Sequence, residues 1–147
     1  MDKTLAQYLF DEVRKTLNFL VTKYGFHQPT LEVDEDIDFA YVTFMGQNLA
    51  IEFVLDEREN DVTCEIARVV DGKKSTEFGV NSCGVRVRTR LTSILEARGV
   101  REKLFRNVGQ LAFSERIPII VEDFAAMLQK HGSEIMNDSE VAFAGQP

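Results

Sequence analysis

Apolar and polar residues alternate along most of the stretch from residue 39 to residue 69, and short polar turns divide it into separate runs. In the clearest run, Leu49, Ile51, Phe53 and Leu55 fall on one side of an extended chain. A period of two indicates a β-strand with one buried face. Because the turns are too short to hold a crossover helix, consecutive strands should pair antiparallel as a meander. The expected strands cover residues 31–33, 39–45, 49–55, 62–69 and 76–80.

Helical periodicity flanks the alternating region on both sides. Apolar residues recur every three or four positions from Leu5 to Tyr24, which predicts a helix with Gly25 in the left-handed conformation and Phe26 folded back onto its last turn. The same spacing predicts three helical stretches in the C-terminal third, at residues 91–99, 100–112 and 114–132. The expected class is therefore α+β: an N-terminal helix, an antiparallel four- to five-stranded meander sheet and a helical C-terminal third.

The length of 147 residues predicts one domain. We assign residues 1–136 to a single α+β domain and expect the polar residues 137–147 to form a flexible tail. No apolar run approaches the about 20 residues that span a bilayer, and the N-terminus lacks the pattern of a signal peptide. Cys64 and Cys83 are the only cysteines, so we expect free thiols and a cytoplasmic protein.

The motifs of common enzyme and metal sites are missing from the sequence. His27 and His131 have no partner at the spacing of a metal site. There is no glycine-rich phosphate loop and no nucleophile elbow. We therefore expect no cofactor, no metal and no enzymatic activity.

Charge is distributed unevenly along the chain. The net charge of −7 argues against binding to nucleic acid or to an anionic membrane, since both require excess Lys and Arg. Residues 1–61 carry a net −8, residues 62–113 a net +5 and residues 114–147 a net −4. Such a dipolar chain can steer toward a basic protein partner or toward a second copy of itself, as a homodimer.

Two acidic clusters follow the first and third expected strands. In a meander, the turns after these strands lie at the same end of the sheet, so the carboxylates should gather on one edge. We predict that this edge binds a basic protein partner, and the alternative is a solvated acidic rim. The predicted partner-binding residues are Asp34, Glu35, Asp36, Asp38, Asp56, Glu57, Glu59 and Asp61.

A calcium loop accounts poorly for the first cluster. Asp34, Asp36 and Asp38 take positions 1, 3 and 5 of an EF-hand loop. However, Phe39 stands where the loop needs glycine and Met45 where it needs a bidentate glutamate.

Arg86, Arg88 and Arg90 alternate with smaller residues. In a strand they would share one face, whereas a helix would spread them around its surface. These arginines could form salt bridges to the acidic rim, bind an anion or take part in self-association.

The chain also resembles a group of small bacterial proteins. The resemblance rests on Tyr24-Gly25-Phe26, Val42-x-Phe44, Asn48-Leu49-x-Ile51-x-Phe53 and Asp56-x-Arg58, and covers about residues 5–70. Some members of this group are immunity proteins that neutralise polymorphic toxins. The resemblance implies a binding protein whose partner is a toxin, and an acidic edge suits the basic active sites of nuclease toxins.

The chain also resembles type III secretion chaperones, which are small, acidic α+β proteins that act as dimers. Their order interposes a helix within the strands, whereas residues 39–80 are expected to form a continuous sheet. An enzyme with a site at the acidic edge and a purely structural homo-oligomer are the further alternatives.

Overall fold

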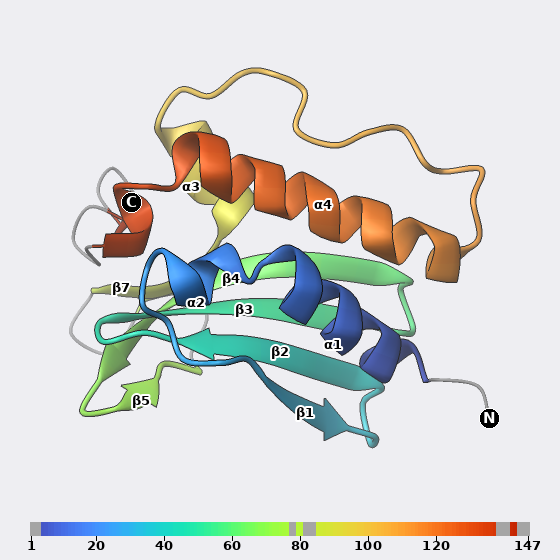
Figure 1. Ribbon diagram of the computed structural model, residues 1–147, viewed down its shortest axis with the longest axis horizontal. Coiled ribbons are helices and arrows are strands. Elements are labelled where there is room, and N and C mark those ends of the chain that lie inside the picture. The colour runs from blue at the N-terminus through green and yellow to red at the C-terminus, as the bar shows by residue number, and fades with distance from the viewer. Residues whose placement is uncertain (1–3, 77–78, 81–84, 138–141, 144–147) are drawn as a thin grey trace.

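The computed structural model describes residues 4–76, 79–80, 85–137 and 142–143. It has the expected α+β class, with helices at the N-terminus, an antiparallel sheet and a long C-terminal helix (Figure 1). The N-terminal and C-terminal helices lie side by side on the same face of the sheet, which makes a two-layer molecule. The predicted loop at residues 81–84, which contains Cys83, lies outside the described residues.

The N-terminal helical region is divided in two. Helix α1 (Leu5–Thr16) ends earlier than predicted, and a short α2 (Phe19–Thr22) follows after a break at Leu17 and Asn18. Asn18 makes no capping hydrogen bond with its side chain, and the low helix propensity of asparagine favours a break at this position. The apolar periodicity nevertheless marks burial correctly, because Leu17 and Leu20 are both fully buried.

The end of α2 follows the prediction. Gly25 has a φ of +77°, a backbone conformation that glycine adopts without strain. The Phe26 N–H donates to the Leu20 carbonyl at 3.0 Å, and the Phe26 side chain is buried in the core. The chain therefore reverses here and enters the sheet.

The first four strands form the predicted meander. They are β1 (Thr30–Asp34), β2 (Phe39–Met45), β3 (Leu49–Asp56) and β4 (Asp61–Val70), each antiparallel to the next. The register places Phe53 opposite Val42 on one side and Cys64 on the other. These three residues belong to the buried set that faces the helices.

The sheet extends beyond the predicted meander. A turn at Asp71 and Gly72 leads into β5 (Lys73–Lys74), which pairs with the end of β4. The remaining strands are β6 (Gly79–Val80) and β7 (Arg86–Arg90), and the order across the sheet is β1-β2-β3-β4-β7-β6. Of the predicted strand at residues 76–80, the described part is a strand only at β6, which pairs with β7 and does not continue the meander from β4. The arginine-rich segment is thus a strand, and Arg88 pairs with Ala67 on the face away from the helices.

The C-terminal third contains α3 (Leu91–Ala97), α4 (Phe113–His131) and the short η1 (Ile135–Asn137). The predicted helix at residues 100–112 is wrong. Residues 98–112, here called the strap, contain no helix: Val100 and Leu104 pack against the core cluster from an irregular backbone, and Phe105 packs on α4. The Phe105 ring packs edge-on against Phe124 at 5.3 Å between centroids.

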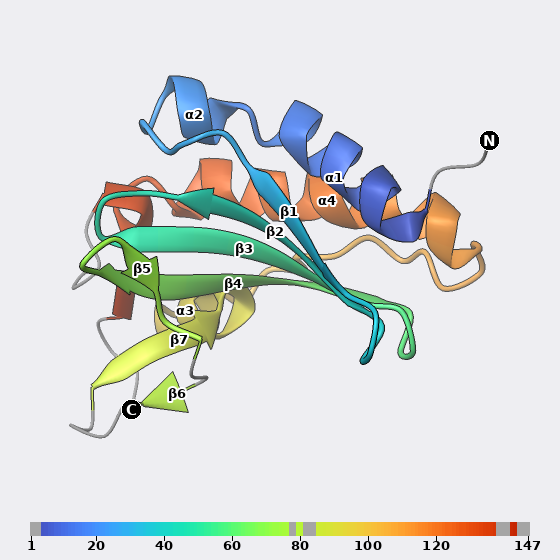
Figure 2. The ribbon, with the colours of Figure 1, turned by 90° about the horizontal axis from the view of Figure 1, so that it is seen from below.

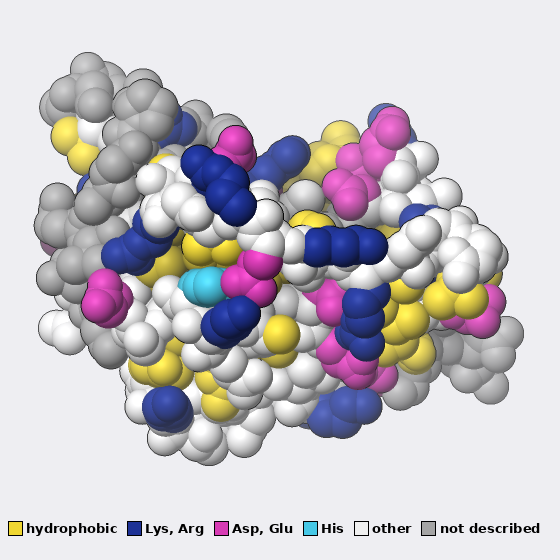
Figure 3. Space-filling view, turned by 90° about the horizontal axis from the view of Figure 1, so that it is seen from above, with side chains coloured by type: hydrophobic (Ala, Val, Ile, Leu, Met, Phe, Trp, Pro, Cys, Tyr) yellow, Lys and Arg dark blue, Asp and Glu magenta, His cyan; other side chains and the backbone are white. Residues whose placement is uncertain are grey.

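Polar contacts also hold the strap. The Arg106 N–H and Nε donate to the Asp123 carboxylate at 3.1 and 2.8 Å. Near the C-terminal end of α4, Glu102 accepts a hydrogen bond from Lys130 at 2.8 Å and lies 2.8 Å from His131. Figure 3 shows this face with basic and acidic side chains intermixed.

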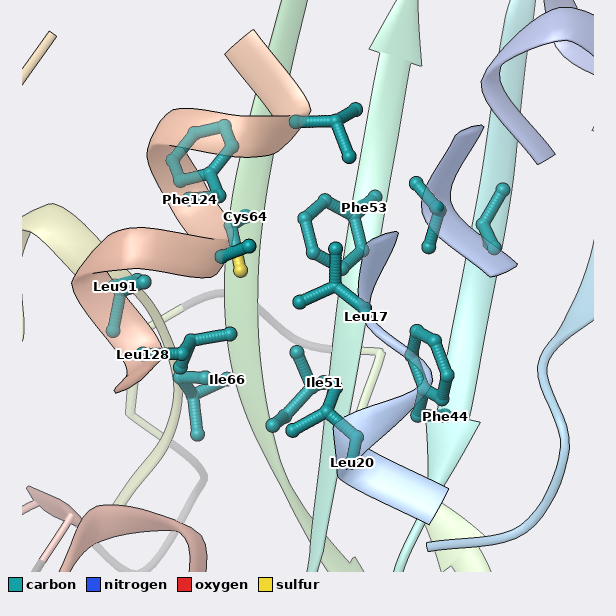
Figure 4. Close-up of a cluster of buried hydrophobic side chains, with 14 of the residues drawn as sticks. Leu17, Leu20, Phe44, Ile51, Phe53, Cys64, Ile66, Leu91, Phe124 and Leu128 are labelled. Carbon is teal, nitrogen blue, oxygen red and sulfur yellow. The ribbon is translucent and has the colours of Figure 1, made fainter. Parts of the chain in front are cut away.

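The core lies between the sheet and the helices (Figure 4). Phe53 is at its centre, with Phe44 at 6.4 Å and Phe124 at 5.9 Å between ring centroids, both edge-on. Cys64 is buried in β4, as the sequence predicts for a small core residue.

The predicted tail is described only in part. Residues 138–141 and 144–147 lie outside the described residues. Ala142 and Phe143 are buried in the core, and the guanidinium of Arg68 lies 4.5 Å from the centroid of the Phe143 ring. The chain is therefore anchored to the core at this point.

Candidate functional site

The two acidic clusters meet at one end of the sheet. The β1–β2 turn and the β3–β4 turn lie side by side there, near the N-terminal end of α1 (Figure 2). The register follows from the meander, since Phe39 pairs with Asp34 on one side and with Asp56 on the other, and Asp56 pairs with Asp61. We call the eight predicted partner-binding residues the acidic edge.

Two of these carboxylates shape the turns. The Asp34 side chain accepts the Asp36 N–H at 3.2 Å. The Asp56 side chain accepts the N–H groups of Arg58 and Glu59 at 3.1 and 3.2 Å. Such local bonds are a common use of aspartate in turns. Asp34 and Asp56 therefore have a structural role, whatever else they bind.

Arg58 connects the two turns. Its Nε donates to the Asp38 carboxylate at 3.1 Å, and its terminal nitrogen donates to the Asp36 carbonyl at 3.3 Å. The Glu57 N–H also donates to the Asp38 carbonyl at 3.0 Å. Arg58 is the only Lys or Arg between residues 24 and 67, so it offsets only one of the eight charges.

A hollow of about 260 Å³ lies between the acidic edge and the start of α1. Four of the eight predicted residues line it, whereas Asp36, Asp56, Glu59 and Asp61 do not. Apolar atoms form part of its wall and carboxylates stand around them. Its lining residues are Thr4, Ala6, Val33, Asp34, Glu35, Asp38, Phe39, Ala40 and Glu57.

The hollow suits one long cationic side chain. Its volume is below the roughly 300–1,000 Å³ of pockets for drug-sized ligands. The methylene groups of a lysine or arginine can lie on Val33, Phe39 and Ala40 while the charge meets the carboxylates. Among the described residues, no group of three or more metal-ligating side chains comes together.

A second charged cluster escaped sequence analysis. Glu52 of β3 is 1% exposed and forms ion pairs with Arg88 of β7 and Lys74 of β5. Arg88 also pairs with Glu65 at 2.8 Å and donates to the Ser75 carbonyl at 3.2 Å. We call Glu52, Glu65, Lys74 and Arg88 the charge clasp. It lies on the sheet face away from the helices and holds β5 against the sheet.

The charge clasp has the properties of a structural element. Two acids and two bases balance one another, and each is paired. Burial raises the pKa of Glu52, but hydrogen bonds from Lys74 and Thr43 and the charges of Arg88 and Lys74 outweigh burial and hold this pKa below its usual value. In the sequence, Glu52 in the buried strand β3 is the only sign of the charge clasp, because its partners are distant in sequence.

The lowered pKa predicts how stability depends on pH. An unfolded chain titrates Glu52 near 4.5, so its ionised form stabilises the fold above that pH, and the stabilisation is lost as the pH falls through the lower folded pKa. In urea unfolding, the advantage of the wild type over Glu52→Gln should be largest near neutral pH and shrink in acid. An advantage that stays constant into strong acid would contradict this.

Cys64 does not provide a nucleophile. Its thiol is buried in the core, and burial raises its pKa well above the usual value, so the thiolate is disfavoured. His131 and Glu102 form a pair that joins the strap to α4, which gives His131 a structural role.

Comparison of the chain with protein-family models, with curated proteins and with solved structures finds no match. Among the described helices, none is both long and apolar enough to cross a bilayer. Function must therefore be argued from the geometry of the acidic edge.

Proposed function

We propose that this chain is a non-enzymatic cytoplasmic protein that binds a basic protein partner through the acidic edge. Immunity-type neutralisation of a toxin is the role that best suits such a surface, since it can cover a basic active site. The observation that carries the proposal is the meeting of eight carboxylates at one end of the sheet with Arg58 as the only cation in the two turns. Six of the eight side chains are exposed, so the charge is available to a partner.

The electrostatics favour a protein over other polyelectrolyte partners. Nucleic acids and anionic membranes are repelled by carboxylates, whereas Lys and Arg on a protein are attracted. Elsewhere the four residues of the charge clasp are paired with one another, and Arg98, Glu102 and Arg106 of the strap have ionic partners within the chain. The acidic edge therefore concentrates the uncompensated charge that can steer a partner.

An enzyme with its site at the acidic edge is the second candidate, favoured by the hollow that four carboxylates line. Asp34 is engaged in its turn and Asp38 in an ion pair, which leaves Glu35 and Glu57 for acid–base chemistry. A general acid needs burial to keep its proton near neutral pH, and both glutamates are exposed. Binding therefore fits this surface better than catalysis.

A dimer that resembles a secretion chaperone is the alternative within the binding class. The strands β1 to β4 follow one another without an intervening helix, which does not favour it. The nature of the captured partner separates the two roles: a toxin supports neutralisation, and a secreted cargo protein supports chaperoning.

The test is capture of a basic partner from lysate by the immobilised chain at about 50 mM and about 500 mM salt. A variant that neutralises exposed carboxylates without disturbing the turns should bind the partner with an association rate about tenfold lower at low salt. The substitutions are Glu35→Gln, Asp36→Asn, Glu57→Gln and Glu59→Gln.

A matched control removes the same number of charges from exposed positions away from the edge. Its substitutions are Asp71→Asn, Glu96→Gln, Glu115→Gln and Glu134→Gln, of which Glu134 forms an exposed ion pair with Arg98. This control should bind nearly as fast as the wild type. Equal rates for the wild type and the edge variant at low salt would overturn the proposed function.

A further inference from the structure

Strand β1 is the free border of the sheet. It pairs with β2 on one side, and on its other side no backbone hydrogen bond is formed by any described residue. Four of its five residues are exposed. Figures 1 and 2 show it as the outermost strand, leading into the acidic edge. A border strand presents a row of unpaired N–H and C=O groups that can pair with another extended chain.

The two faces of β1 differ in chemistry. Glu32 and Asp34 lie opposite Tyr41 and Phe39, on the face away from the helices. Val33 lies opposite Ala40 on the helix-facing side and is 51% exposed. It also lines the hollow beside the acidic edge. A chain laid along β1 would thus meet carboxylates on one face and an exposed valine on the other.

We propose that β1 takes up an extended basic segment of the partner protein as an added strand of the sheet. This inference rests on the proposed function and specifies how the partner is held. The backbone of the segment pairs with the free side of β1. Its Lys or Arg side chains alternate toward Glu32 and Asp34, and the intervening apolar side chains pack beside Val33.

The charges on β1 disfavour a second copy of this chain as the occupant. In a symmetric antiparallel pair of β1 strands with full overlap, Glu32, the middle residue of Thr30–Asp34, would lie directly opposite its own copy. Like charges at directly opposed positions destabilise a strand pair. The acidic turns of the two copies would add to the repulsion. The same side chains therefore resist self-pairing and attract a basic strand.

Two synthetic peptides of equal charge separate strand pairing from simple charge attraction. The first is acetyl-Lys-Val-Lys-Thr-Lys-Val-Lys-amide, and the second has proline in place of both valines. Proline removes backbone donors and disfavours a paired strand. Fluorescence anisotropy at about 50 mM salt should show at least about tenfold tighter binding of the valine peptide.

Hydrogen exchange of the backbone amides, followed by NMR on the full chain, gives an independent measurement. The valine peptide should slow the exchange of those β1 amides that face outward, by at least about tenfold at saturation. The proline peptide should leave them unchanged.

The outcomes distinguish the two proposals. If both peptides bind equally and the β1 amides exchange as in the free chain, the added strand is overturned while the acidic edge remains a binding surface. If the edge variant no longer captures the lysate partner but this partner does not slow the exchange of the β1 amides in the wild type, the added strand is again overturned and the acidic edge remains a binding surface. If neither peptide binds and the edge variant keeps the lysate partner, both proposals are overturned.

Discussion

Replacing Arg88 by methionine is expected to lower the free energy of unfolding by about 3–5 kcal/mol, the effect of removing one partner from a buried ion pair. Arg88 is buried between Glu52 and Glu65. Methionine is also long and unbranched but carries no charge, so Glu52 would keep only Lys74 as its ionic partner. Urea unfolding followed by circular dichroism near neutral pH measures the change.

The exposed ion pair between Arg58 and Asp38 provides the matched control. Arg58→Met should change the free energy of unfolding by less than about 1 kcal/mol, because water screens this pair. A double variant, Glu52→Leu with Arg88→Met, should recover part of the loss, since no uncompensated Glu52 charge remains buried. Similar effects of Arg88→Met and Arg58→Met would show that the charge clasp is not a buried, coupled unit.

Those parts of the fold in which local pattern and burial agree could be predicted from the sequence. Strands β2 and β4 largely alternate because one face meets the helices, whereas β3 is buried on both faces from Leu49 to Leu55, which corrects the expectation of one buried face for that strand. Helix α4 could be recognised because its apolar stripe lies on the core and Gly132 ends it. The irregular structure of the strap could not be predicted, because its apolar residues have helical spacing although no helix forms. Phe105, for example, packs on Phe124 from a non-helical backbone.

The location of the acidic edge followed from topology alone. In a meander, the turns after the first and third strands lie at the same end of the sheet, and the structure places both clusters there. The bridging role of Arg58 and the hollow beside Val33 depend on side-chain positions that no local pattern encodes. The charge clasp was out of reach for a similar reason, since Glu52 and Arg88 are 36 residues apart.

The charged residues of this chain serve two different purposes. Those of the charge clasp, together with Arg98, Glu102 and Arg106 of the strap, are paired across elements, and they hold β5 and the strap in place. Those of the acidic edge face water, with Arg58 as their one counter-charge in the turns. A surface with so much like charge is destabilising unless solvent or a partner relieves it. The contrast between paired and unpaired charge therefore supports the proposal that the acidic edge is a binding surface.

Replacing Phe53 by alanine is expected to lower the free energy of unfolding by about 3–5 kcal/mol, as for other fully buried phenylalanines. Phe53 has no exposed surface and contacts aromatic rings from both layers, Phe44 of β2 and Phe124 of α4. Its removal leaves a cavity at the centre of the core that rigid neighbours fill only in part. Thermal and urea unfolding should both show the loss.

Phe105→Ala is the matched control, because both side chains pack edge-on against the same Phe124 ring. Phe105 is 38% exposed and belongs to the strap, so its loss removes one aromatic contact and leaves no enclosed cavity. We expect a decrease of about 1 kcal/mol. If Phe105→Ala destabilised the chain as much as Phe53→Ala, the strap would be part of the cooperative core rather than a segment anchored onto it, and the two-layer description would need to include it.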